Sequence, residues 1–155
     1  MNTMLILLII LALFLSALFA SAVKRVPSGQ VYSLYRRGKP VRLLQPGTHV
    51  LMPLRDRVAH RIDLGGHILR FQESLAGTHD VSGRVYWQVL EPEQADAVIE
   101  QADQLIRSGT LDALRGEPEV AGDDSRDLGL RLKQKLNLAL RERGVMVTRV
   151  ELEFA

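Results

Sequence analysis

The side chains best suited to acid–base or metal chemistry are four histidines, spread unevenly along the chain: His49, His60, His67 and His79. Histidines that bind zinc from one helix recur at i and i+4, so that both rings share a face. No two of the four are spaced in this way. We therefore expect no metal site, and no cofactor is indicated.

Motifs for nucleophilic or nucleotide chemistry are also absent. The sequence contains no Gly-x-Ser-x-Gly, no Walker loop and no Gly-x-Gly-x-x-Gly. It has no cysteine, which excludes disulfides, thiolate zinc sites and thiol catalysis. We expect a protein that is not an enzyme. The alternative, a membrane-tethered or exported enzyme whose site forms only on folding, stays open.

Charge is strongly segregated along the chain. Residues 24–70 contain ten Lys or Arg and two acids, whereas residues 71–124 contain three Arg and twelve acids. Juxtamembrane cations attract anionic lipid headgroups by about 1 kcal/mol each; the alternative is a topology signal or an ordinary solvated face. The cations closest to the N-terminal apolar segment are Lys24, Arg25, Arg36, Arg37 and Lys39. Few aromatic residues lie among these cations, so we expect no nucleic-acid partner.

The apolar segment itself runs from Met4 to Val23, and from Met4 to Ala20 it contains no charged residue. A helix of this length spans roughly 30 Å, the thickness of a bilayer's hydrocarbon core. We predict an uncleaved membrane anchor. A cleaved signal ending at Ala20-Ser21-Ala22 and a buried core helix are the alternatives.

The cations after this segment also predict its orientation. By the positive-inside rule the residues that follow the anchor stay in the cytoplasm and the N-terminus lies outside. The protein would then be a single-pass membrane protein. The alternative is an exported, periplasmic domain, because a large C-terminal domain can cross the membrane regardless of its charge.

Periodicity predicts strands first and helices later. Alternation is clearest in Val81–Val89, where Trp87 is expected in the core. Helical spacing follows from Pro92 to Ile106 and stops at Ser108-Gly109. Arg115–Asp124 reads as an exposed loop. Shorter strands are expected at 30–35, 41–44, 49–52, 58–64 and 68–72. Near the C-terminus, a helix capped by Asp124 or Ser125 and ended by Gly144 should precede a last strand at 145–154.

Several of these turns and strands follow one another in a familiar order: Arg36-Arg37-Gly38, Pro46-Gly47, Pro53 and Asp63, then Val85–Val89 before Glu91-Pro92, and Leu136–Val150. This pattern resembles the SPFH or band 7 family of stomatins, prohibitins and flotillins. The resemblance implies an α+β fold in which a transmembrane helix (1–23) precedes an SPFH-like domain (24–155). Its sheet would be mixed and mostly antiparallel, with two amphipathic helices.

The resemblance also implies a function. Members generally act as oligomeric scaffolds, so the expected partners are membrane lipids, a membrane protein such as a protease or channel, and further copies of the chain. The family's long coiled-coil helix does not follow the last strand, which predicts weak self-association. An acidic helix face could meet the basic 36–39 turn of a neighbouring copy; its residues are Glu93, Asp96, Glu100 and Asp103.

Overall fold

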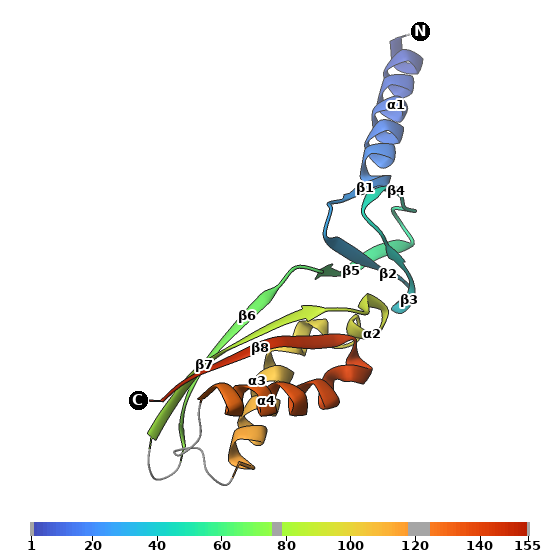
Figure 1. Ribbon diagram of the computed structural model, residues 1–155. Helices are drawn as coiled ribbons and strands as arrows, with labels where there is room; N and C mark the ends of the chain where they lie inside the picture. The colour runs from blue at the N-terminus through green and yellow to red at the C-terminus, as the bar shows by residue number, and fades with distance from the viewer. Residues whose placement is uncertain (1, 76–78, 118–124, 155) are drawn as a thin grey trace. The chain divides into compact units, whose positions relative to one another are not determined.

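The computed structural model describes residues 2–75, 79–117 and 125–154 (Figure 1). The chain forms two compact units, Met1–Arg61 and Ile62–Ala155. The architecture is the predicted one: an N-terminal apolar helix followed by antiparallel strands and helices of an α+β fold. The prediction of one domain over 24–155 stays a prediction.

The first unit begins with helix α1, Asn2–Ala22. Its side chains from Thr3 to Ser21 are exposed except for Leu18, which is half-buried, and its composition is apolar on every side. Among the described helices it alone is long and apolar enough to cross a membrane. The predicted end of the segment differs by one residue, because Val23 leaves the helix to pair with Val50 in a strand.

Two small sheets follow α1. Strands β1 (Val23–Val26) and β4 (Gly47–Val50) form an antiparallel pair, and β3 (Lys39–Leu44), β2 (Gln30–Arg36) and β5 (Asp56–Asp63) form a sheet in that order. The strands predicted at 30–35, 41–44 and 58–64 are confirmed. The small core of this unit contains Val26, Leu34, Leu44 and Leu51.

The β2–β3 hairpin turns at Arg37 and Gly38. Their φ angles are 51° and 77°, and the flanking residues Arg36 and Lys39 pair across the strands. Positive φ at both central positions matches the twist of a two-residue hairpin, which explains why glycine occupies the second of them.

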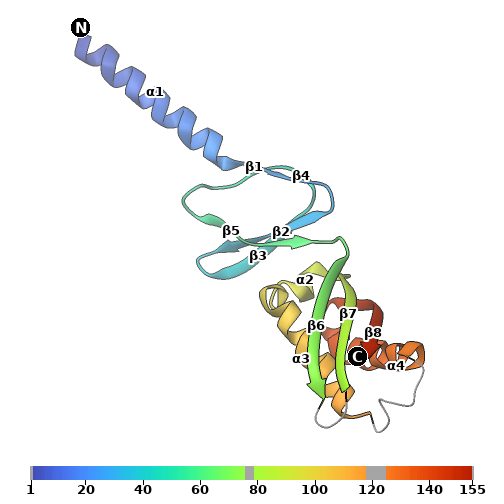
Figure 2. The same ribbon diagram turned by 90° about the vertical axis from the view of Figure 1, so that its left-hand side faces the viewer.

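The second unit is a three-stranded antiparallel sheet covered on one face by helices (Figures 1 and 2). The sheet consists of β6 (His67–Leu75), β7 (His79–Val89) and β8 (Val145–Phe154). Trp87 is 4% exposed and lies in the core, as predicted, together with the alternate residues of β7. The covering elements are α2 (Pro92–Ala95), η1 (Ile99–Gln101), α3 (Ala102–Arg115), α4 (Ser125–Leu140) and η2 (Arg141–Arg143).

The helix predicted from Pro92 to Ser108 is wrong at its middle and its end. The backbone leaves the helical region at Val98, with φ −124° and ψ −2°, so α2 and α3 are separate. Helix α3 then continues through Ser108-Gly109. The Ser108 hydroxyl donates to the Leu105 carbonyl, and a Cβ at Gly109 would lie 3.1 Å from Leu136 Cδ2 of α4. Gly109 thus permits helix packing and does not end a helix.

This break also changes the predicted acidic face. Its four acids are divided among α2, the following turn, η1 and α3, and Asp96 is 7% exposed. They therefore do not share one continuous helix face. The predicted loop Arg115–Asp124 begins too early, because Arg115 is the last residue of α3. Residues 118–124, including the candidate cap Asp124, lie outside the described residues, and Ser125 is the first residue of α4. Gly144 has φ 66°, the left-handed conformation of the predicted helix-ending glycine.

Helix α4 is fixed against β8 by a close approach and by a side-chain bridge. A Cβ at Gly129 would lie 2.7 Å from the Val150 carbonyl oxygen. The Val147 amide donates to Asn137 Oδ1 over 2.7 Å, and Asn137 Nδ2 donates to the Val147 carbonyl over 3.0 Å. These bonds reach β8 next to the point where its register with β7 shifts, and they satisfy the amide and carbonyl of Val147 in this edge strand.

We predict that Gly129→Ala destabilises the second unit. Alanine is the better helix former by about 1 kcal/mol, but the clash with Val150 should outweigh this and give a net loss of about 1–3 kcal/mol. Chemical unfolding of the detergent-solubilised chain, followed by the fluorescence of Trp87, measures it. Gly116→Ala is the matched control, because its Cβ would make only 3.6 Å contacts. Equal stability of the two variants would contradict the packing described.

Candidate functional site

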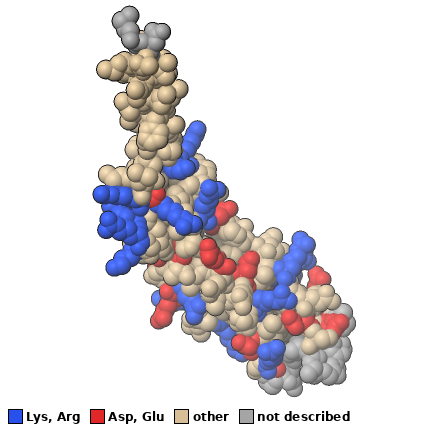
Figure 3. All heavy atoms as spheres, turned by 180° about the vertical axis from the view of Figure 1, so that it is seen from behind, with Lys and Arg blue, Asp and Glu red and all other residues tan. Residues whose placement is uncertain are grey.

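Several of the predicted membrane-proximal residues lie where α1 ends and strand β1 begins. The Leu51 amide donates to the Ala22 carbonyl over 2.8 Å, and both residues are buried. Lys24 and Arg25 lie on β1, and their side chains are exposed. Basic side chains accordingly gather next to the base of the uncharged helix (Figure 3). No linker separates the helix from the sheet.

Arg36 has a different role from the other four predicted cations. Its Nε donates to Asp56 Oδ1 over 2.8 Å, and the Asp56 side chain is only 6% exposed. The other oxygen, Oδ2, accepts from the Met52 amide over 3.1 Å. Arg36 therefore ties the end of β2 to the start of β5, whereas Arg37 and Lys39 in the hairpin turn are exposed.

These contacts also set the charge state of the pair. The hydrogen bond from Arg36, followed by that from the Met52 amide, holds the pKa of Asp56 below its usual value. The same hydrogen bond raises the pKa of Arg36. Sequence reasoning identified Arg36 but not Asp56. The available signal was that Asp56 is one of only two acids among the ten cations of residues 24–70.

The residues that carry the family-like motif all lie in turns or at the ends of strands: Gly38, Pro46, Gly47, Pro53 and Asp63. Gly47 has φ 137°, a conformation that other residues rarely adopt, and it pairs with Val26. Asp63 Oδ1 accepts from the Gly65 amide over 2.9 Å. The contacts described for these residues fix the backbone conformation of turns and strand ends.

The histidines are not brought together. The His60 ring lies edge-on to Tyr35, with centroids 5.6 Å apart, and the His67 ring stacks on Trp87 at 4.3 Å. His49 Nε2 is 2.7 Å from the Gln45 carbonyl oxygen. Within residues 2–75, 79–117 and 125–154 no group of three or more His, Asp or Glu side chains is placed to hold a metal. The His79 side chain lies outside the described residues.

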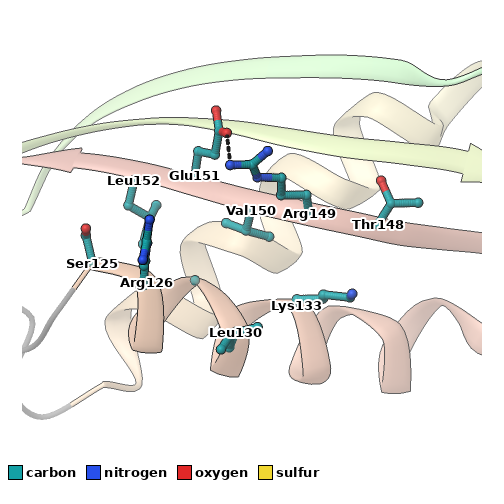
Figure 4. A pocket seen from close by; sticks show the side chains of 10 residues that line it. Ser125, Arg126, Leu130, Lys133, Thr148, Arg149, Val150, Glu151 and Leu152 are labelled. Atoms are coloured by element: carbon teal, nitrogen blue, oxygen red, sulfur yellow. Dashed lines mark ion pairs between the residues drawn. The ribbon is translucent and has the colours of Figure 1, made fainter.

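Two shallow grooves of the second unit are lined by described residues. One, of about 480 Å³, runs between α4 and β8, and Figure 4 shows Arg126, Lys133 and Arg149 around it. Arg149 there pairs with Glu151 over 2.8 Å. The other groove, of about 560 Å³, is lined by arginines, serine and acids, and Arg84 in it pairs with Glu153 over 3.0 Å. Neither lining includes histidine, so the described side chains offer charge for binding and no imidazole base.

No protein-family model matches the chain. It is 31% identical over 121 residues, 75% of its length, to an uncharacterized protein of Schizosaccharomyces pombe, of which it covers 33%. Stomatin-like protein 2, mitochondrial, of Homo sapiens is 25% identical over 120 residues, 74% of this chain and 33% of that protein. The Mus musculus protein of the same name is 26% identical over 117 residues, 72% and 32%. The chain thus spans about a third of the length of these relatives.

We predict that Asp56→Asn loosens the segment between β4 and β5. The substitution removes the ion pair to Arg36 and weakens the hydrogen bond that residue 56 accepts from the Met52 amide. Amide hydrogen exchange over residues 52–56 should become faster in the variant. Arg37→Gln, which changes the exposed neighbour of Arg36, is the control and should leave this exchange unchanged. Unaltered exchange in Asp56→Asn would show that the pair does not hold the segment.

The pH dependence follows from the lowered pKa of Asp56. The pair stabilises the folded chain at pH values above the ordinary aspartate pKa of about 3.9, and this stabilisation is lost as the pH falls through the lowered folded-state value. We therefore expect no change around neutral pH in the protection factors of residues 52–56, that is, in their exchange rates after the intrinsic base-catalysed pH dependence has been divided out. An NMR titration in which the Asp56 carboxyl titrates at or above its ordinary pKa would contradict this.

Proposed function

We propose that this chain is a single-pass membrane protein of the SPFH/band 7 type, a non-enzymatic scaffold that organises lipids or partner membrane proteins such as a protease or a channel. The observation that carries the proposal is the exposed, uncharged helix α1 running directly into strands whose sequence is distantly similar to stomatin-like protein 2. Oligomerisation of the chain in the membrane is part of the proposal.

The exposed helix supports the membrane part of the proposal, because leaving its apolar side chains in water is unfavourable. Burial of each Leu, Ile or Phe side chain is favourable by about 1.5–3 kcal/mol. From Thr3 to Ser21 the described residues of the chain bury none of the helix side chains and half-bury only Leu18. A helix of this length matches the hydrocarbon thickness, so a bilayer would bury the side chains that the chain leaves in water.

The β-strands support the family part of the proposal. The motif residues follow the order of the SPFH pattern in sequence, and two of them, Gly38 and Gly47, have the positive φ angles that favour glycine. The distant similarity to stomatin-like protein 2 covers about three quarters of the chain. Neither observation concerns a substrate, which is why the proposed role is one of organisation and not of catalysis.

For topology we propose that everything after α1 is cytoplasmic. A cytoplasmic reporter fused after Ala155 should be active, and alkaline phosphatase fused at the same place should be silent. Replacing Lys24, Arg25, Arg37 and Lys39 by Gln, with Lys added after Met1, should weaken or invert this pattern. Arg36 is left unchanged because its ion pair with Asp56 is structural.

Two outcomes would contradict this topology. Alkaline phosphatase activity from the unmodified fusion would place the domain outside the cytoplasm, and a mature chain beginning at Val23 would mean that the helix is a cleaved signal. Either leaves the fold as described but removes the cytoplasmic, anchored arrangement.

The scaffold role predicts close neighbours in the membrane. Because the chain has no cysteine, a single Cys at the exposed position Lys39 can be cross-linked in native membranes with a thiol–amine reagent. We expect products that contain a second copy or a partner membrane protein. The cysteine-free chain, treated identically, is the control: it can give no product that joins two copies, and it shows which partner products do not depend on the introduced cysteine. Monomer alone from the folded Lys39→Cys chain would count against a scaffold.

A further inference from the structure

An apolar turn lies in the first unit immediately after β4. This apolar turn is Val50–Leu54, and three of its side chains are exposed: Val50 by 66%, Met52 by 56% and Leu54 by 92%. Single exposed apolar residues are common on protein surfaces. Three within five consecutive residues are a local concentration of exposed apolar side chains, and exposed apolar patches often mark protein or membrane interaction sites.

The apolar turn is held in place despite its exposure. Leu51 is buried, and its amide donates to the carbonyl of Ala22, the last residue of α1. The Met52 carbonyl accepts from the amides of Arg55 and Asp56 over 3.0 and 2.9 Å. The Asp56 carboxylate, itself held by Arg36, closes the turn through the Met52 amide. The exposed side chains of the turn therefore project from a backbone that hydrogen bonds hold in place.

The position of the apolar turn follows from the same bonds. If α1 crosses the bilayer, its end at Ala22 lies at the edge of the hydrocarbon core. The bond between Ala22 and Leu51 places the turn at that edge as well. Leu54 follows three residues later, which is at most about 10 Å of extended chain. Figure 2 shows the segment after β4 returning beside the end of α1.

Cations flank this patch. Arg55 and Arg57 follow the turn and are exposed, and Lys24 and Arg25 are exposed on β1, which pairs with the strand that leads into the turn. Membrane-surface elements combine an apolar face that enters the headgroup boundary with Lys or Arg that remain at the phosphate level. A protein partner would not require the turn to sit at the end of α1, whereas a bilayer does.

We propose that the apolar turn Val50–Leu54 is a second membrane contact, inserted into the headgroup and outer acyl region of an anionic bilayer, with Arg36 and Asp56 as its positioning residues. The inference rests on the proposed anchoring by α1. A single helix can rotate about its axis and tilt in the bilayer, and the sheet joined to it moves with it. A second contact restricts both motions and so fixes how the first unit faces the membrane.

The test uses the natural absence of cysteine from the chain. Full-length protein with Leu54→Cys carries an environment-sensitive NBD label and is reconstituted into phosphatidylcholine–phosphatidylglycerol vesicles with nitroxide-bearing lipids. We expect blue-shifted emission and stronger quenching by nitroxides near the headgroups than by deep ones, since interfacial elements enter by about 5–10 Å. Leu11→Cys reports on α1, and Leu138→Cys, a leucine 77% exposed on α4, is the matched control.

The outcomes separate this inference from the proposed anchoring. A lipid-quenched Leu11 label with a Leu54 label in water overturns the membrane contact of the turn and leaves the anchor intact. A Leu11 label in water overturns the anchor and the turn contact together. Equal blue shifts at Leu54 and Leu138 would mean that the dye drives insertion, and would also overturn the inference.

The positioning residues provide a second test. Asp56→Asn, in the Leu54→Cys background, should reduce the nitroxide quenching of the label, because the turn is no longer closed. Arg37→Gln, next to Arg36 but exposed, should not. Amide hydrogen exchange of β2, which lies in the first unit with Asp56, confirms that each variant is folded. Quenching that is unchanged in Asp56→Asn would overturn the positioning role, and quenching that is independent of phosphatidylglycerol would overturn the preference for anionic lipid.

Discussion

The hydrogen bond between the Leu51 amide and the Ala22 carbonyl joins the apolar helix to the sheet that follows it. It satisfies a carbonyl at the end of α1 that would otherwise lack a helical partner, and it brings β4 against β1. Because Val23 is already part of a strand, no flexible linker lies between helix and sheet. Whatever holds α1 therefore also holds the first strands, and the exposed cations of β1 stay next to it.

The cations of the first unit divide into two groups by their contacts. Arg36 is committed to the buried carboxylate of Asp56, and its removal would leave that carboxylate without its main partner. A buried charge without a partner is costly, so the pair has a structural role. Lys24, Arg25 and Lys39 project from strands and turns with exposed side chains. They are available to lipid phosphate or to a topology-determining machinery, and structure alone distinguishes them from Arg36.

Different contacts hold the second unit together. Its sheet is covered by helices on one face, and on the other Arg84 of β7 forms ion pairs with Glu151 and Glu153 of β8. Helix α4 approaches β8 so closely that Gly129 leaves no room for a methyl group. Glu117, held by Lys135 and Arg131 of α4, has its pKa lowered by the bond from Lys135. These contacts hold α3, α4 and the sheet of the second unit together.

The sequence by itself determined the elements whose faces differ in polarity: the uncharged helix, the strands of residues 81–89 and 145–154, and the helix that ends at Gly144. Periodicity reports which side chains avoid water, so such elements can be predicted locally. It does not report partners. The passage of α3 through Gly109 depends on Leu136, and the Arg36–Asp56 pair joins residues 20 positions apart. Only the tertiary structure decided these, because helix packing and strand register bring together residues whose own neighbours in sequence carry no sign of the contact.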